Sequence, residues 1–401
     1  MLFVLKKSLK SLQNRLHEFL WELDEEIGVA GLSSGAVTHA RRKLKASAFV
    51  ELNRICIVEK FYGPQYAPLV ELWGGHRLLG IDSSKLRLPK SEELKKRFGV
   101  VKVGNERGVC EEYPEGRVSV LYDLLNGLGL EGCLVSSSCG EVDLAIGHLG
   151  QARKGDVIIT DRGYCGYEWF AEVRRHGLDF ICRCQNKSFG IVNELFARNE
   201  EGVSVVVELR AQKNLVSQLR RKGLAEVMKV RFVTVRLSSG ELEVLATSLL
   251  QEQEYGTEEF SGVYWARWGH ETYYGDLKGA LDLEHFSGKT IESVEQDFQA
   301  LVFLANLQSV LVGPAEEELA QRSRRLKNPV QVNRSVALHA VKTRALDLLA
   351  SRVPIPKVLE QLHCWFLHNP VALRQSRKVP RSKPSLARSY HYQRRVRKCV
   401  Y

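Results

Sequence analysis

Two acidic residues end or interrupt strongly apolar segments of the sequence. Asp82 follows the apolar run of HRLLGID (76–82), and Asp161 closes DVIITD (156–161). A buried carboxylate is costly unless a cation or a metal ion pairs with it. Because sites in α/β sheets are built at strand ends, both residues are candidate metal ligands. Taken singly, each could instead cap a turn, since Asp is common in turns.

A third acid, Glu271, lies in a segment with helical spacing, YWARWGHETYYGDLK (264–278). At 100° per residue, four polar side chains fall within an arc of about 60° along about 20 Å of helix. They are Tyr264, Arg267, Glu271 and Lys278. Phosphodiester chemistry needs this mixture, a carboxylate for a metal ion together with cations and a phenol for phosphate. The alternative is a solvated helix face with one Arg267–Glu271 ion pair.

The acids and the spacing Y-(2)-R-(3)-E-(6)-K over 264–278 resemble the D-D-E transposases of bacterial insertion sequences. The resemblance is to the group that bears the Y-R-E-K signature. Matching context includes GIDSSKLRLP (80–89) and GDVIITDRGYCGYEWF (155–170), and the resemblance covers roughly residues 37–312. The match is specific, because the four signature residues occur at the right spacing and follow two Asp residues in the expected places.

The resemblance implies an α/β fold, with a ribonuclease-H-like catalytic core interrupted by a β-rich insertion and with helical N-terminal and C-terminal regions. The catalytic residues, which would also hold the metal, are Asp82, Asp161 and Glu271. They would bind two Mg²⁺ ions, for which Mn²⁺ can substitute, with Asp82 bridging both ions. The residues implied to bind DNA phosphate are Tyr264, Arg267 and Lys278.

The spacing between the acids agrees with this implication. The second Asp and the Glu are 110 residues apart (271 − 161), and the segment between them is β-rich.

Two features depart from the family. Ser83 and Ser84 follow the first Asp, where Gly and then Thr or Ser are common. No Trp lies between 188 and 260, so no base-stacking residue is assigned to the insertion.

Composition shifts and hydrophobic periodicity predict five regions. They are a helical N-terminal DNA-binding region (1–70), the first part of the core (71–187), the β-rich insertion (188–258), the second part of the core with the Glu helix (259–312), and a helical C-terminal region with a basic tail (313–401). Predicted strands are 76–82, 117–125, 156–161, 179–184, 203–209, 227–237 and 241–250. Predicted helices are 3–26, a second one capped by Ser33 or Ser34, 164–177, 260–312, 331–350 and 356–367.

Several other residues near the candidate site have simpler interpretations. Asp123 and Asp156 are competing acids on predicted strands. His270 points about 100° away from Glu271 around a helix, so we interpret it as incidental. Trp265 and Trp268 are interpreted as core residues.

The charge of the chain is concentrated at one end. Lys and Arg number 58 against 47 Asp and Glu, and ten of the basic residues lie in 361–401, where there is no acid. Such a tail indicates a polyanionic partner.

The odd number of cysteines, nine, with no Cys-x-x-Cys pair, favours neither a zinc site nor a disulfide framework. The apolar start is too short for a signal peptide, and we expect LVFLANLQSVLV (301–312) not to span a bilayer.

Together these features predict a DNA transposase that binds terminal inverted repeats, cuts at the ends and joins the 3′-hydroxyls to target DNA. The resemblance implies as partners double-stranded DNA, from the element ends and the target, and a second copy of the chain in a synaptic homodimer. No membrane partner is expected, and the expected location is the bacterial cytoplasm, at the nucleoid. Two alternatives stay open, a non-catalytic DNA-binding protein derived from a transposase and another nuclease with a ribonuclease-H fold.

Overall fold

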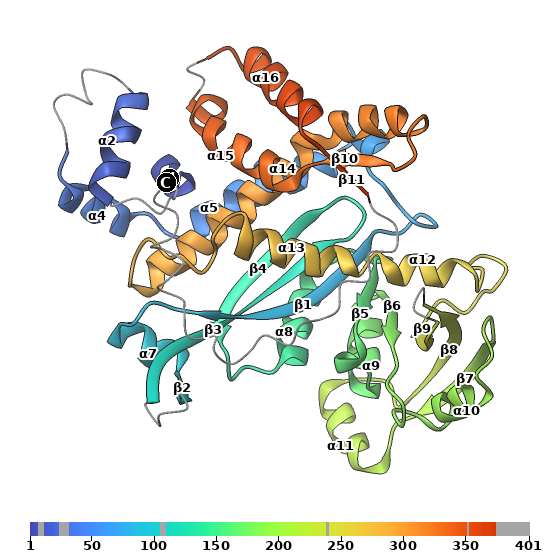
Figure 1. Cartoon of the computed structure of the whole chain (residues 1–401). Coiled ribbons are helices and arrows are strands. Elements are labelled where there is room, and N and C mark those ends of the chain that lie inside the picture. The colour runs from blue at the N-terminus through green and yellow to red at the C-terminus, as the bar shows by residue number, and fades with distance from the viewer. Residues whose placement is uncertain (7–11, 24–31, 105–109, 238–239, 351–352, 374–401) are drawn as a thin grey trace. The chain divides into compact units, whose positions relative to one another are not determined.

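The structure, a computed structural model, describes residues 1–6, 12–23, 32–104, 110–237, 240–350 and 353–373. It divides into two compact units, each assembled from separate stretches of chain (Figure 1). The helical unit comprises Met1–Ile57, Leu86–Gly116 and Gly275–Tyr401, and the sheet unit comprises Val58–Lys85 and Arg117–Tyr274. The five regions expected from the sequence stay predictions.

The sheet unit is built around one mixed sheet. In spatial order the strands are β4 (Leu128–Ser136), β3 (Cys110–Asp123), β1 (Leu78–Arg87), β5 (Val157–Thr160), β6 (Asp179–Arg183), β9 (Leu242–Thr247), β8 (Val227–Arg236) and β7 (Ser204–Arg210). Strands β1, β5 and β6 are parallel, and β6, β9, β8 and β7 pair antiparallel. All seven predicted strands are confirmed, whereas β4 was not predicted. The expected α/β class is therefore correct.

The central strand β5 is buried on both faces, as its continuous apolar sequence predicts. Successive side chains of a strand point to opposite faces. Ile158 accordingly packs into one cluster with Phe170, while Val157 and Ile159 pack into another with Phe260. Phe170 belongs to helix α9 (Tyr167–Arg175) and Phe260 to helix α12 (Glu259–Trp265), so a helix covers each face of the sheet.

Short helices connect these strands. They are α6 (Glu59–Phe61), η2 (Ala67–Leu69), α8 (Glu141–His148), η3 (Leu149–Gln151), η4 (Arg162–Tyr164), α9 (Tyr167–Arg175), α10 (Gly190–Arg198), α11 (Lys213–Lys222), α12 (Glu259–Trp265) and α13 (Trp268–Gly279). The predicted helix 164–177 is confirmed as α9. The helices α10 and α11 fall in the predicted β-rich insertion, which is thus a mixture of strands and helices.

The helical unit gathers both ends of the described chain. Its helices are α1 (Leu2–Leu5), α2 (Leu12–Leu23), α4 (Ser34–Lys43), α5 (Ser47–Asn53), η1 (Arg54–Val58, running into the sheet unit), α7 (Glu92–Phe98), α14 (Ile291–Ser323), α15 (Arg334–Ala350) and α16 (Ile355–His368). Strand β2 (Val100–Gly104) pairs with the first half of β3, and β10 (Val330–Val332) pairs with β11 (Pro370–Ala372). The Ser33 hydroxyl accepts the Ala36 N–H and caps α4, as predicted.

Helix α14 is the centre of the helical unit, since α1, α4, α5, α7, α15 and α16 all contact it. Arg41 of α4 binds it most extensively. Its guanidinium donates to Asp297 at 2.8 Å, to Gln296 at 2.6 Å and to the Ser293 carbonyl at 2.9 Å. Asp297 is completely buried. Arg41 therefore has a structural role, whereas its neighbour Arg42 is exposed.

Helix α14 is also, in the part of the chain that is described, the one helix long and apolar enough to cross a membrane. Most of its apolar stretch is buried inside the protein. Core helices have the same length and composition, so this helix by itself is weak evidence for a membrane span.

Replacing Arg41 by Met is expected to destabilise the protein by about 3 kcal/mol, because Asp297 would keep a buried charge without its cation. Urea unfolding followed by circular dichroism measures this difference. Arg42→Met changes an exposed residue of the same helix and is the matched control, with an expected effect within about 0.5 kcal/mol. Equal effects of the two substitutions would contradict the structural role of Arg41.

Candidate active site

Asp82 lies within β1, at the point where the fully buried half of the strand gives way to half-buried residues. It is thus inside a strand and not at its end. The Ser83 N–H donates to its carboxylate at 2.7 Å. Burial raises the pKa of Asp82 to about 6, although the Ser83 N–H and the positive charge of Arg267 lower it, and the nearby acids Glu141 and Glu271 raise it further. Asp82 is therefore a carboxylate whose charge the protein only partly compensates.

Asp161 directly follows β5, as the sequence predicts, and begins the short helix η4. The Tyr264 hydroxyl donates to Asp161 Oδ1 at 3.2 Å. The guanidinium of Arg183, on the adjacent strand β6, lies 3.7 Å from the same oxygen. Arg183 also forms a two-pronged ion pair with Glu243. Asp161 is thus held by a buried phenol and by a cation that it shares with another acid.

The predicted helix over 264–278 is wrong in one respect, because the structure divides it into α12 and α13. Between them the N–H groups of Arg267, Gly269 and His270 bond to carbonyls three residues earlier. Bonds of this kind tighten the backbone relative to an α-helix. Tyr264 therefore lies in α12, Arg267 at the junction, and Glu271 in the first turn of α13. Arg267 still reaches Glu271, with its Nη2 at 3.1 Å from Oε1.

Arg267 connects the three candidate acids. Its side chain is only 8% exposed and lies 5.3 Å from the Trp268 ring centre. Burial by itself would lower the pKa of Arg267, but Tyr264, Asp161 and Glu271 outweigh burial and raise it. Arg267 also acts electrostatically on Asp82. One guanidinium therefore stands among all three carboxylates.

Lys278 belongs to the helical unit, since the sheet unit ends at Tyr274. Burial lowers the pKa of Lys278, while Glu284 and Glu115 raise it. Its expected role as a phosphate-binding residue stays a prediction.

The competing acids are used elsewhere in the structure. Asp156 forms a buried ion pair with Arg77, at 2.8 Å between Oδ1 and Nε. Asp123 is completely buried and accepts the Tyr62 hydroxyl. Both carboxylates therefore have structural partners, which separates them from the acids around Arg267.

His270 is fully buried and stacks on Tyr274, with ring centres 5.1 Å apart. Burial lowers the pKa of His270 to about 3. A Cβ added to Gly80 of β1 would come within 3.0 Å of its Nδ1, so α13 approaches the strand that bears Asp82 very closely. His270, interpreted from the sequence as incidental, has a packing role between α13 and β1. The core interpretation of Trp265 is wrong, because 59% of this residue is exposed.

Two residues that the sequence analysis missed reach Asp82. The hydroxyls of Tyr274 and Ser119 donate to the Asp82 carbonyl oxygen at 2.8 Å and 3.2 Å. Neither contact has a signal in the sequence, because the partners are distant along the chain and tyrosines are frequent around 264–274. Tyr274 reaches the site because it lies three residues after Glu271 on α13. Ser119 reaches it because it lies on the neighbouring strand β3.

The candidate metal ligands supply only oxygen donors, which suits Mg²⁺ or Mn²⁺. The incompletely compensated charge of Asp82 also favours a cation. Within the described residues, however, no group of three or more His, Cys, Asp or Glu side chains is arranged to hold a metal ion. Arg267 supplies positive charge among the acids in this arrangement.

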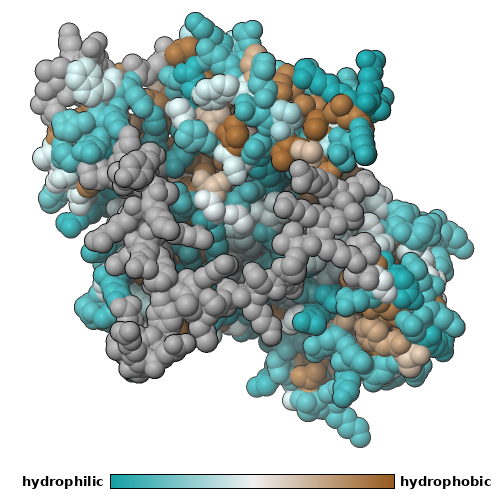
Figure 2. Space-filling model, viewed as in Figure 1, coloured by the Kyte–Doolittle hydropathy of each residue, from teal (hydrophilic) through white to brown (hydrophobic). Residues whose placement is uncertain are grey.

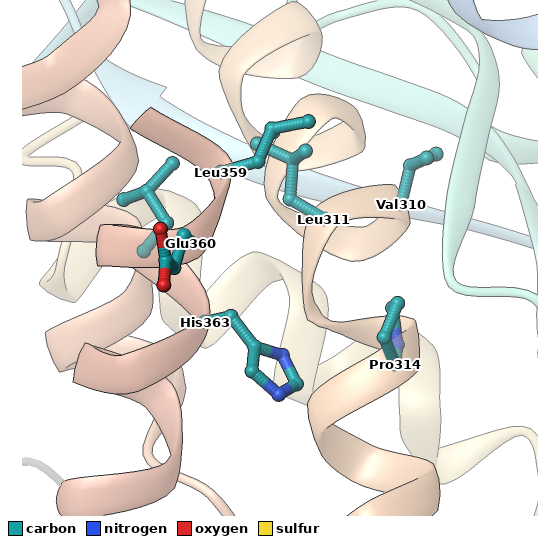
Figure 3. A pocket seen from close by; sticks show the side chains of 7 residues that line it. Val310, Leu311, Pro314, Leu359, Glu360 and His363 are labelled. Atoms are coloured by element: carbon teal, nitrogen blue, oxygen red, sulfur yellow. The ribbon is translucent and has the colours of Figure 1, made fainter. Parts of the chain in front are cut away.

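A separate pocket lies in the helical unit between α14 and α16 (Figure 3). It is lined mainly by apolar residues, which are Val310, Leu311, Pro314, Leu359 and Leu362, with Glu360 and His363. Figure 2 shows apolar residues on the surface of this part of the unit, and Leu359 and Trp365 of α16 are exposed. None of the candidate catalytic residues lines this pocket.

The comparison with family models matches residues 73–307 to the transposase DDE domain. Among solved structures, the piggyBac transposase synaptic complex with hairpin DNA, determined by cryo-EM, is similar with a TM-score of 0.36 and 9% sequence identity. That similarity covers 77% of this chain and 59% of the other, so the chain spans less than two thirds of that relative. A similarity this weak carries no argument about the site or the partners of this chain. No curated protein matched the sequence.

Asp82→Asn is expected to stabilise the metal-free protein at pH 7. With a pKa near 6 in the folded protein and about 3.9 in the unfolded chain, Asp82 binds its proton more tightly when folded. Its contribution to stability is therefore complete below about pH 4 and is lost as the pH rises through 6, by at most about 3 kcal/mol. Urea unfolding of both proteins in EDTA at pH 4.5 and 7.5 measures this. A stability difference that does not change with pH would contradict the raised pKa.

Proposed function

Because the chain belongs to the transposase DDE domain family, we propose that it is a DNA transposase that cuts at the ends of a DNA element and joins the 3′-hydroxyls to target DNA. One observation carries the proposal. Asp82 on β1, Asp161 directly after the parallel strand β5, and Glu271 on α13 all interact with the guanidinium of Arg267 within the sheet unit. The structural partners of Asp123 and Asp156 support the choice of these three acids over those two competitors.

We assign Asp82, Asp161 and Glu271 as the residues that would hold two Mg²⁺ ions. When bound, such ions activate a water or a 3′-hydroxyl and stabilise the leaving oxygen. The described side chains do not form a ready ligand set, so their carboxylates would have to rearrange on binding.

The remaining groups of the site suit a phosphate ligand. Arg267 presents a planar fork of donors that matches phosphate oxygens, and the Tyr264 hydroxyl can donate beside it. Both groups are engaged by acids in the described structure. We propose that they transfer to the DNA phosphate beside the scissile bond, and that Lys278 joins them there.

We further propose that the core is ribonuclease-H-like and that residues 188–258 form its insertion. The support is local. Strands β7, β8 and β9 follow β6 in the chain and extend the same sheet, and helix α12 then returns along its face. The antiparallel extension explains how 110 residues can separate Asp161 from Glu271 (271 − 161) without disturbing the parallel strands β1 and β5.

The proposal includes membership of the Y-R-E-K group of bacterial insertion sequences, a homodimer in the synaptic complex, and a location at the bacterial nucleoid. The N-terminal region would contact DNA through exposed basic residues of α4 and the turn after it. These are Arg42, Lys43 and Lys45. Arg41 is excluded from this surface because it pairs with Asp297.

A non-catalytic DNA-binding protein is the second candidate. The N-terminal basic residues and the basic tail would serve it equally well. A protein without catalytic activity would not need the buried Arg267 or the partly compensated charge of Asp82. Burying such charges is costly, so their presence would then be unexplained. The site therefore favours catalysis.

The decisive experiment uses a supercoiled plasmid that carries the DNA flanking the gene, with Mg²⁺ and either wild-type protein or Glu271→Gln. We expect cleavage at the ends by the wild type and a loss of at least about 100-fold in Glu271→Gln, because one metal ligand is removed. Asp123→Asn is the matched control for removal of an acid outside the site, assayed after its folding is checked. Equal cleavage by wild type and Glu271→Gln would refute the assignment of the metal ligands.

The basic tail, which lies outside the described residues, is expected to bind DNA through phosphate. Residues 374–401 hold ten Lys and Arg and no acid. Deleting them is expected to weaken binding to nonspecific duplex DNA and to reduce the slope of log K against log salt concentration by several units. Fluorescence anisotropy between about 50 and 200 mM salt measures the slope. An unchanged slope would show that the tail makes no contact with phosphate.

A further inference from the structure

Two hydroxyl groups converge on the carbonyl oxygen of Asp82. Tyr274 donates to it at 2.8 Å and Ser119 at 3.2 Å. A carbonyl oxygen has two lone pairs, so it can accept both hydroxyls at once. The same peptide group is thereby fixed in orientation, and with it the direction in which the Asp82 side chain leaves the strand.

Tyr274 lies on α13, three residues after Glu271, so its bond joins the Glu271 helix to the Asp82 strand across 192 residues of sequence. Tyr274 is 6% exposed. Its ring is stacked at 12° on His270, which itself lies against Gly80 of the same strand. A hydroxyl on a ring this closely packed has little freedom to leave its acceptor.

Ser119 is held in turn by a second chain of polar contacts. His148 Nε2 lies 3.0 Å from the Ser119 hydroxyl, and His148 Nδ1 lies 2.7 Å from Glu131. A serine hydroxyl has one proton, so a Ser119 that donates to Asp82 must accept from His148. This chain orients Ser119 from the β3 side, while Tyr274 acts from the helix side.

We propose that Tyr274 is a positioning residue that sets Asp82 relative to Glu271 for phosphoryl transfer. The proposal rests on the function proposed above. Displacement of a reacting group by about 1 Å can lower a rate about 100-fold. The bond from Tyr274 ties the helix of Glu271 to the backbone of Asp82. Arg267, by contrast, bonds to Glu271 but acts on Asp82 and Asp161 only through charge.

The adjacent residue provides a matched control. Tyr273 is on the same helix, is 3% exposed, and has a buried hydroxyl that bonds to no other described group. Removing the hydroxyl from Tyr273 or Tyr274 deletes the same atom from the same buried helix. The two substitutions differ in whether a contact with Asp82 is lost.

The test compares Tyr274→Phe, Tyr273→Phe and wild type in single-turnover cleavage at several Mg²⁺ concentrations, with DNA affinity measured in parallel. Tyr274→Phe is expected to lower the cleavage rate about 10- to 100-fold and to raise the Mg²⁺ concentration for half-maximal rate. DNA affinity should stay within about twofold, and Tyr273→Phe should match wild type. Equal rates for the two variants, or a loss of rate matched by a loss of DNA affinity, would overturn the proposal.

Hydrogen–deuterium exchange of the metal-free proteins separates this inference from the proposed function. Tyr274→Phe should speed exchange in the peptide that contains Asp82, and Tyr273→Phe should not. Ser119→Ala loses the other donor and should produce the same local effect if Tyr274→Phe folds poorly. Unchanged exchange in Tyr274→Phe and Ser119→Ala would refute the tether. Failure of wild type to cleave would refute the function alone.

Discussion

The candidate site depends on the buried guanidinium of Arg267. Three carboxylates gathered in one half-buried site repel one another, and burial favours their protonated forms. Arg267 bonds to Glu271 and acts by charge on Asp82 and Asp161. It therefore allows the three acids to remain near one another in the folded protein. The compensation is incomplete at Asp82, whose raised pKa leaves a demand for further positive charge.

The sheet supplies the rigid part of this arrangement. Because β5 is buried on both faces, Ile158 packs towards α9 while its neighbours pack towards α12. Asp161 follows directly, at the first position where the strand ends. The parallel pairing of β1 with β5 brings the strand of Asp82 alongside. The tight turn between α12 and α13 then allows Tyr264 to reach Asp161 and Arg267 to reach Glu271.

Charged residues outside the site divide into structural and exposed groups. Arg231 of β8 is completely buried and bonds to the Tyr255 carbonyl and the Thr257 hydroxyl. It thus ties the antiparallel part of the sheet to the segment that leads into α12. Arg41 does the equivalent for α4 and α14 in the helical unit. These buried contacts make Arg231 and Arg41 structural residues, so neither is a candidate for DNA contact.

The sequence by itself determined the α/β class, the seven strands with apolar or alternating patterns, a helix cap at Ser33 or Ser34, and the acids with their Y-R-E-K spacing. These features depend on local preferences and on the period of side chains along one element, which short stretches of sequence express. Tertiary structure decided the break at 266–267, the structural role of Arg41, the exposure of Trp265 and the bond from Tyr274 to Asp82. Each of these depends on which distant segments pack together, and the partners of Tyr274 and Arg41 lie 192 and 256 residues away. No local pattern encodes such a contact, because the free energy that selects it comes from the packing of whole elements.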